Sequence, residues 1–415
     1  MTNSSSRSTD LPSLTGLRFW AAFAILLNHL LLGFVASDNL YLSNILSRCG
    51  DIGMNIFFIL SGFIIHYNYN HILNKYSLKY FFHFMIARFS RLYPLFILFF
   101  ILEFFTLQGF NRYNLQEIFY SIPLFVTMSQ SWFYTIVNVS NPTLLPHMYD
   151  RASIAWSISS EFLMYCGYSL LLWLVVRDAM SRSARIVVTV MFCLSAGLLM
   201  QYAINTTDLF DALVIPWFGD GASSRGSYLS SFHFWFTARS PYFRFIEFAI
   251  GVSIAHLYMT LRDHPVGTVE GMVMPIAGLT CVAIVFAIML PLQWRPEIFG
   301  TLFRYLGFYP YIAFIIFVCA RYDFSLLSMF FSIRFFILFG EASYSIYLIH
   351  IFFYGMVSHD AGAAPILLFL QIITLWMFIF TCAHILYVTL EMPARRWLRG
   401  WLTRHLESFQ RFKPV

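Results

Sequence analysis

Charged side chains are scarce in this sequence, and their scarcity excludes a soluble protein. Asp, Glu, Lys and Arg together make up 11% of the 415 residues, whereas soluble domains carry about 25%. Hydrophobic residues make up 59% and the mean hydropathy is +0.69, so the chain has too few polar groups to cover a water-facing surface. Aromatic residues make up 20%, as is typical of lipid-facing helices with interfacial Trp and Tyr. The composition predicts an all-α polytopic membrane protein.

Cysteine is also sparse, and its positions indicate neither disulfide bonds nor a metal site. Five of the six cysteines lie in apolar segments and Cys49 alone lies in a loop, so no disulfide framework or metal-ligand spacing can be read. The sequence also lacks heptads, tandem repeats, a Gly-rich phosphate loop and a second soluble domain. The net charge of +6 comes from basic residues spread over short loops, which indicates membrane orientation and no nucleic-acid partner.

Long apolar runs, by contrast, are plentiful, and about 20 apolar residues are enough to span a bilayer as a helix. The pattern predicts about ten transmembrane helices, at residues 17–35, 52–67, 92–107, 153–176, 185–204, 241–259, 272–291, 302–320, 334–355 and 364–390. The run 118–136 is also apolar, but Pro123 and scattered polar groups interrupt it. We expect an interfacial or re-entrant segment there, with an eleventh span as the alternative.

The distribution of Lys and Arg predicts the orientation of these helices. With the N-terminus in the cytoplasm, the inner segments hold about twice as many Lys and Arg as the outer ones, as is typical of cytoplasmic loops. Ten spans then place both termini in the cytoplasm, whereas eleven would put the basic C-terminal tail outside. We therefore expect a disordered cytoplasmic N-terminus (1–13), a transmembrane domain (14–392) and a basic cytoplasmic C-terminal tail (393–415).

Two long segments, 108–152 and 205–240, are predicted on the outer side. They contain aromatic and acidic residues, among them Trp132, Asp208 and Trp235. This combination suits sugar binding, and it suits ordinary anchoring at the membrane interface as well.

The first apolar run, LTGLRFWAAFAILLNHL (14–30), carries two polar groups that are costly in a membrane. Arg18 and His29 are eleven residues apart, which is about three helical turns and a rise of about 16 Å, so they share one face. Ionisable residues inside a membrane usually face a bundle interior or a water-filled cavity. The alternative is that Arg18 reaches back to the inner interface while His29 caps a backbone carbonyl.

Two further stretches carry ionisable groups in apolar surroundings. In ARFSRLYP (87–94), Arg88 and Arg91 lie three residues apart on one helical face, where both guanidinium groups can bind phosphates. In AWSISSEFLMY (155–165), Glu161 lies inside a predicted span or at its outer mouth and needs a partner, for which His29 or an arginine is suited. The alternatives are a positive-inside pair that anchors a helix and a structural ion pair.

Taken in order, these stretches resemble the membrane-bound acyltransferase-3 family. The resemblance covers about residues 11 to 399. It rests on the Arg18–His29 spacing and on the ordered set DIGMNIFFILSGFII (51–65), RFSR (88–91), WSISSEF (156–162), RFIEFAIG (244–251), GEASYSIYLIH (340–350) and YVTLEMPARRWL (387–398). Each motif alone is weak evidence for the family, whereas the ordered set on ten predicted spans is strong evidence. The family's glutamate is often followed by a second acidic residue or a Gln-Phe-Tyr run, which this chain lacks after Glu161.

The resemblance implies an O-acyltransferase of the cell membrane, in bacteria the cytoplasmic membrane. It would transfer an acyl group, by default acetyl, from cytosolic acyl-CoA to an extracytoplasmic polysaccharide or glycolipid. No covalently bound cofactor is expected, and acyl-CoA is the donor substrate. Carried over, the catalytic pair falls on His29 and Glu161, and the acyl-CoA-binding arginines on Arg18, Arg88 and Arg91. Supporting hydroxyl donors for the oxyanion fall on Ser343, Tyr344 and Ser345.

Other interpretations stay open at this point. A member of the same family can acylate a small molecule, and a transporter or flippase also lines its path with intramembrane Arg, His and Glu. No inverted repeat or pair of broken helices in the sequence favours a transporter. Direct transfer and an acyl-histidine intermediate are both compatible with the residues. The sequence leaves the acceptor and the oligomeric state open.

Overall fold

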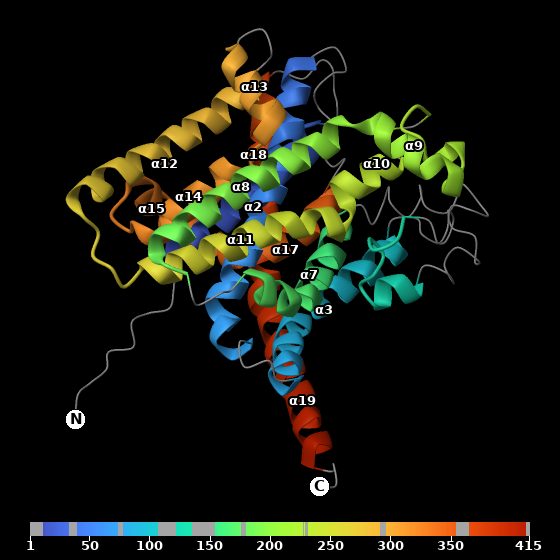
Figure 1. The fold of residues 1–415 in the computed structure, drawn as a ribbon. Helices are drawn as coiled ribbons and strands as arrows, with labels where there is room; N and C mark the ends of the chain where they lie inside the picture. The colour runs from blue at the N-terminus through green and yellow to red at the C-terminus, as the bar shows by residue number, and fades with distance from the viewer. Residues whose placement is uncertain are drawn as a thin grey trace, which may run out of the picture.

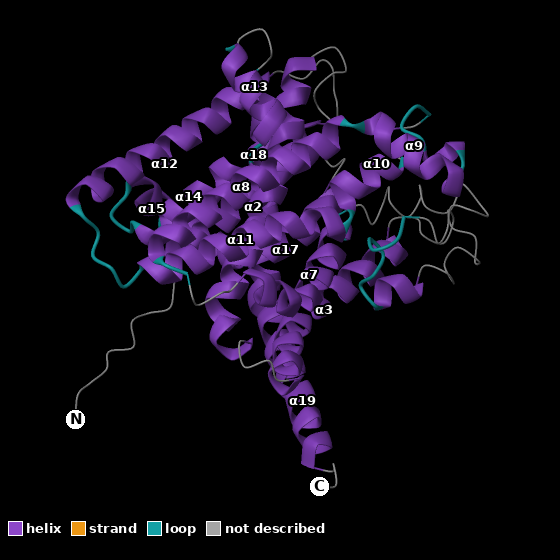
Figure 2. Cartoon of the chain, in the orientation of Figure 1, coloured by secondary structure: helices purple, strands orange, loops and turns teal. Residues whose placement is uncertain are grey.

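The fold is known from a computed structural model, in which every described secondary-structure element is helical (Figure 1 and Figure 2). The structure describes residues 11–32, 40–73, 78–106, 122–134, 154–175, 180–226, 228, 231–290, 296–353 and 365–411. The predicted N-terminal segment 1–13 lies mostly outside these ranges, and the first helix begins at Pro12.

The described elements are helices along the whole chain. Their order is α1 (Pro12–Leu32), α2 (Leu40–Leu73), α3 (Leu78–Thr106), α7 (Trp156–Val175), α8 (Arg182–Asn205), α9 (Thr207–Phe218), η1 (Asp220–Ala222), α10 (Phe232–Phe234), η3 (Trp235–Arg239), α11 (Pro241–Leu261), α12 (Thr268–Met289), α13 (Glu297–Leu306), α14 (Tyr309–Arg321), α15 (Leu326–Phe331), α16 (Arg334–Glu341), α17 (Ser343–Ile349), η4 (His350–Phe353), α18 (Pro365–Leu386), η5 (Tyr387–Glu391) and α19 (Met392–Arg411).

Within the described residues, seven helices are long and apolar enough to cross a membrane, and nine spans result if each of two sharply bent helix pairs counts as one. The bent pairs are α13 with α14, at 87°, and α16 with α17 and η4, at 61°. The all-α membrane architecture is therefore confirmed. The remaining predicted span, 153–176, corresponds to α7, which is not among these nine, so the count of ten stays a prediction.

At the centre of the bundle, α2 packs against both α1 and α11. Glycines allow α2 and α11 to approach closely. A Cβ atom on Gly62 would lie 2.0 Å from the carbonyl oxygen of Phe248, and one on Gly251 would lie 1.9 Å from that of Ile59. Membrane helices associate through such small residues because lipid supplies no hydrophobic driving force between them. This close approach fixes the position of α2 relative to α11.

The sharper bend of the two bent pairs lies between α13 and α14, where Gly307 adopts a positive φ of 62°. A non-glycine residue is strained in that conformation, and a Cβ atom there would also meet Nε2 of Gln201 at 2.5 Å. Figure 1 shows α13 at one end of the molecule and α19 at the opposite end. The two ends of the bundle therefore differ in structure.

The C-terminal helices form one long rod that includes a π-helical stretch. η5 interrupts the α-helical pattern between α18 and α19 and carries Glu391, which is buried. π-helical turns inside α-helices occur frequently at functional sites. α19 packs against α3 and projects beyond the bundle (Figure 1), so the basic tail predicted for 393–415 is helical as far as Arg411.

The apolar run 118–136 is described over residues 122–134 only. There the chain reverses at Met128, which has a positive φ of 52°, and the amide of Ser129 donates to the carbonyl oxygen of Leu124. Trp132 donates from Nε1 to the carbonyl oxygen of Ser159 at 3.0 Å, which ties the segment to α7. These described residues form a turn against α7.

Candidate active site

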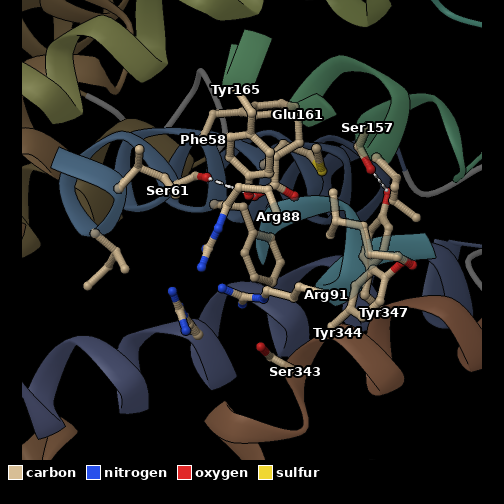
Figure 3. Close-up of a pocket in the computed structure, with 17 residues that line it drawn as sticks. Phe58, Ser61, Arg88, Arg91, Ser157, Glu161, Tyr165, Ser343, Tyr344 and Tyr347 are labelled. Atoms are coloured by element: carbon tan, nitrogen blue, oxygen red, sulfur yellow. Dashed lines mark hydrogen bonds between the residues drawn. The ribbon is translucent and has the colours of Figure 1, made fainter. Parts of the chain in front are cut away.

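Residues from five helices, α1, α2, α3, α7 and α17, line a cavity of about 70 Å³ inside the bundle (Figure 3). We call it the arginine cavity. Its lining is Arg18, Met54, Phe57, Phe58, Ser61, Ile64, Ile65, Arg88, Arg91, Leu92, Ser157, Ile158, Glu161, Tyr165, Ser343, Tyr344 and Tyr347.

Most of the predicted site residues meet in this one cavity. Six of the eight line it, namely Arg18, Arg88, Arg91, Glu161, Ser343 and Tyr344. They are distant in the sequence and converge because α1, α2, α3, α7 and α17 surround the same space. The other two, His29 and Ser345, do not line it.

The three arginines differ in how they are held. The NH2 group of Arg88 donates to the hydroxyl of Tyr69 at 2.7 Å, and its guanidinium stands 4.8 Å from the centre of that ring. The guanidinium groups of Arg18 and Arg91 make no hydrogen bond or ion pair with any described residue. Because a cation in an apolar interior needs a counter-charge, two arginines of the cavity are available to an anionic ligand.

A fourth arginine, which the sequence analysis did not single out, approaches from the C-terminal rod. Arg395 of α19 is close enough to Arg88 and Arg91 for electrostatic repulsion between them. Its position follows from the packing of α19 on α3. The motif YVTLEMPARRWL contained this residue, but only the fold identifies which of its arginines faces α3.

Glu161 is the carboxylate of the cavity, and its partners lie on α2 and α7. Its Oε1 accepts a hydrogen bond from Oγ of Ser61 at 2.7 Å and a short one from the hydroxyl of Tyr165. Ser61 and Tyr165 were not among the predicted site residues. Within the described residues, Glu161 makes no hydrogen bond to His29, so the predicted pairing of the two is not seen.

The Ser-Tyr-Ser stretch of α17 is divided between two environments. Ser345 is fully buried and donates from Oγ to Oε2 of Glu391 at 2.6 Å, and the hydroxyl of Tyr344 donates to the carbonyl oxygen of Leu92 at 2.8 Å. Ser343 lines the cavity and makes no hydrogen bond to a described residue. Of the three hydroxyls, that of Ser343 is therefore the one available to a ligand.

His29 is paired with a second histidine, His350, from the start of η4. Nε2 of His350 lies 3.1 Å from Nδ1 of His29, and Nδ1 of His350 lies 2.7 Å from the carbonyl oxygen of Tyr347. A carbonyl only accepts, so Nδ1 of His350 carries the proton, and its Nε2 then accepts from Nδ1–H of His29. This assignment leaves Nε2 of His29 with a free lone pair, as a general base requires.

Tyr347 connects the histidine pair to the arginine cavity. Its ring lines the cavity and its centre lies 5.9 Å from that of His350. Its hydroxyl is held by Ser157 at 2.7 Å and by the carbonyl oxygen of Ile154 at 2.7 Å. His350 and Tyr347 both belong to the motif GEASYSIYLIH, but the sequence does not indicate that they lie near His29.

The geometry thus combines two chemical features. One is a cavity with three arginines and one carboxylate, which carries excess positive charge and suits an anion such as a phosphate. The other is an imidazole base held in one tautomer by a second imidazole. A nucleophilic hydroxyl activated by such a base is the arrangement of acyl-transfer sites.

Comparison with known proteins gives one match. A model of an acyltransferase domain family, acyltransferase-3, matches residues 11–390. No curated protein and no solved structure matches the chain. The match covers all the helices that line the arginine cavity.

Proposed function

The chain belongs to the acyltransferase-3 family of membrane acyltransferases, and we propose that it takes its acyl group from cytosolic acyl-CoA. The acceptor is a hydroxyl group of an extracytoplasmic polysaccharide or glycolipid. The acyl group is acetyl, as the family resemblance implies. In this proposal the protein is a multi-pass protein of the bacterial cytoplasmic membrane, with α19 on the cytoplasmic side.

The observation that carries the proposal is the convergence of Arg18, Arg88 and Arg91 on one cavity. Coenzyme A carries a diphosphate and a 3′-phosphate, and guanidinium groups bind phosphates through paired, charge-assisted hydrogen bonds. The cavity is too small for a nucleotide, so the phosphates lie against the arginines and the thin pantetheine arm extends between the helices. One carboxylate, Glu161, offsets only part of the positive charge.

His29 acts as the general base in this proposal. Its Nε2 accepts the proton of the acceptor hydroxyl while the oxygen attacks the thioester carbonyl. A tetrahedral oxyanion forms, the carbon–sulfur bond breaks, and the CoA thiolate leaves with the proton from His29. General-base catalysis contributes about 10²–10⁴-fold. The hydroxyl of Ser343 supplies a hydrogen bond that stabilises the oxyanion, and Arg18, about 16 Å from His29 along α1, contacts the donor instead.

The test uses radiolabelled acetyl-CoA with the purified protein and with membranes that contain it. We expect saturable acetyl-CoA binding to the purified protein, and transfer of label into the glycan fraction of the membranes. The variant His29→Ala should bind acetyl-CoA like the wild type and transfer no label. A protein that binds no acetyl-CoA, or that moves an unmodified solute across the membrane without transferring label, contradicts the proposal.

A further inference from the structure

A second and much larger cavity lies beside α13, at the end of the bundle opposite α19. It measures about 690 Å³, within the range of about 300–1,000 Å³ of small-molecule sites. We call it the polar cavity. Its lining is Arg48, Asp51, Asn55, Gln201, Ile204, Asn205, Tyr228, Phe234, Thr237, Ala238, Arg244, Glu297, Gly300, Thr301, Phe303, Arg304, Phe308 and Tyr309.

Helix α2 separates the polar cavity from the arginine cavity. Asp51 and Asn55 of α2 line the polar cavity, and Phe58 lines the arginine cavity. The guanidinium of Arg244, in the wall of the polar cavity, stands 5.9 Å from the ring centre of Phe58 and 5.7 Å from that of Trp156. Aromatic rings and one guanidinium therefore form the partition between the two cavities.

The polar cavity lies at the same level of the bundle as His29. A Cβ atom on Gly50 would lie 3.0 Å from Cγ of Asn28, and Nδ2 of Asn28 donates to the carbonyl oxygen of Leu46 at 2.9 Å. His29 follows Asn28 on α1, and Asp51 follows Gly50 on α2. Asn28, the neighbour of His29 on α1, thus packs against the turn of α2 that precedes Asp51 of the polar cavity.

The charges in the polar cavity do not suit a simple ion. Arg244 is already satisfied, because NH1 donates to Glu247 at 2.5 Å and Nε and NH2 both donate to the carbonyl oxygen of Ala238. Arg48 stacks on Phe303 at 4.8 Å. Three arginines and two acidic residues line the cavity, so neither an anion nor a cation meets charges of one sign only.

The polar cavity is lined by both hydrogen-bonding groups and aromatic rings. The carboxylate of Asp51 is exposed to it and makes no hydrogen bond or ion pair with a described residue, so it can accept from ligand hydroxyls. Amide and hydroxyl groups come from Asn205, Thr301 and Tyr228. A ligand with many hydroxyl groups and apolar ring faces, a sugar, matches this set.

We propose that the polar cavity binds one sugar unit of the acceptor glycan, next to the unit that His29 acylates. This inference rests on the proposed function and narrows it, because a cavity separated from His29 by a helix serves an acceptor of several linked units and not a small molecule. Asp51 and Thr301 are then residues that bind the glycan, and the reacting unit lies on the His29 side of α2.

The test measures glycan binding by the full chain on a printed panel of neutral, N-acetylated and acidic oligosaccharides with their monosaccharides. Thr301→Trp fills the polar cavity, and Asp51→Asn removes the free carboxylate at constant size. Ile298→Trp is the matched control, because Ile298 is exposed on the same helix and does not line the cavity. Acetyl-CoA binding is measured for each variant in the same preparation.

We expect the wild type to bind an oligosaccharide of the panel more tightly than the corresponding monosaccharide. Thr301→Trp and Asp51→Asn should each weaken that binding at least tenfold, with Ile298→Trp and acetyl-CoA binding unchanged. Absence of glycan binding by the wild type, or unchanged binding by Thr301→Trp, overturns the inference. Loss of acetyl-CoA binding by the wild type contradicts the proposed function instead, so the two failures are distinguishable.

Discussion

The imidazole of His350 holds that of His29 through a hydrogen bond of 3.1 Å between Nε2 and Nδ1. The other nitrogen of His350 is held by the carbonyl oxygen of Tyr347 at 2.7 Å. The chain of donors and acceptors ends at Nε2 of His29, which keeps a free lone pair. In serine hydrolases a carboxylate holds the catalytic histidine in this way, and here a neutral imidazole occupies that place.

Replacement of His350 should therefore lower turnover without affecting donor binding. We expect His350→Ala to lower kcat by about 10- to 100-fold, a part of the 10²–10⁴-fold that a general base contributes, with the Kd for acetyl-CoA unchanged. His350→Gln should recover part of the activity, because its amide oxygen can accept from Nδ1–H of His29. Rates of label transfer at saturating acetyl-CoA measure this effect. Equal activity of the Ala and Gln variants would assign His350 to packing alone.

Glu161→Gln tests whether the carboxylate orients His29 or offsets the positive charge of the arginine cavity. The sequence left His29 and an arginine as candidate partners of Glu161, and the structure places Glu161 among the arginines, with Ser61 and Tyr165 as its hydrogen-bond partners. A unit charge at about 8–16 Å contributes on the order of 1–2 kcal/mol at an effective dielectric of about 20. Removal of the negative charge should therefore tighten acetyl-CoA binding by about tenfold.

Equilibrium titration with acetyl-CoA measures this change, and Glu297→Gln is the control. Glu297 is an exposed carboxylate on α13, outside the arginine cavity. An unchanged Kd together with a large fall in kcat would return Glu161 to the role of orienting the base.

Local spacing was enough to predict the arginines of the candidate site. Arg88 and Arg91 are three residues apart, and helical geometry alone puts them on one face. Composition and apolar run length likewise predict the all-α membrane architecture. The separation of Arg18 and His29 along α1 also follows from their spacing in the sequence. In the structure, Arg18 lines the arginine cavity and His29 does not.

Contacts between segments that are distant in the sequence could not be predicted from residue spacing. His29 and His350 are 321 residues apart, and no local pattern indicates that they meet. Spacing carries no information about the distance between Glu161 and a partner on another helix, so an arginine and His29 were equally suited as its partner until the structure showed where the helices lie. The bends of 87° and 61° depend on backbone conformations such as that of Gly307, and hydropathy averaged over a span does not register them.

Close helix packing gives a prediction about stability. In Gly251→Ala the new methyl group would meet the carbonyl oxygen of Ile59 at 1.9 Å, so α2 and α11 must separate. Overpacking costs about 1–3 kcal/mol, and we expect a lower midpoint of thermal unfolding for the detergent-purified protein. Gly271→Ala is the control, because its nearest contact would be 3.4 Å. Equal midpoints for both variants would show that α2 and α11 can adjust.

The orientation in the membrane is testable by cysteine accessibility. In a background without the native cysteines, single cysteines at 78–86 and 396–411 should react with an impermeant reagent only from the cytoplasmic side, and those at 205–226 only from outside. The reason is the excess of Lys and Arg in the predicted inner segments. Labelling of 396–411 from outside would mean an odd number of spans and would also place the polar cavity on the wrong side for an extracytoplasmic glycan.

Arg91 carries the sharpest prediction about the donor, because its guanidinium lines the arginine cavity and is unpaired within the described residues. Hydrogen bonds to charged groups contribute about 1.5–3 kcal/mol, so Arg91→Lys should weaken acetyl-CoA binding by about 10- to 150-fold, since lysine cannot copy the bidentate geometry. Arg88→Lys should also weaken binding, and Arg334→Lys, at an exposed position, should not. The loss should shrink with acetyl-pantetheine, which lacks the phosphates. If Arg91 only anchors α3, the Lys variant will show a normal Kd and a reduced protein yield.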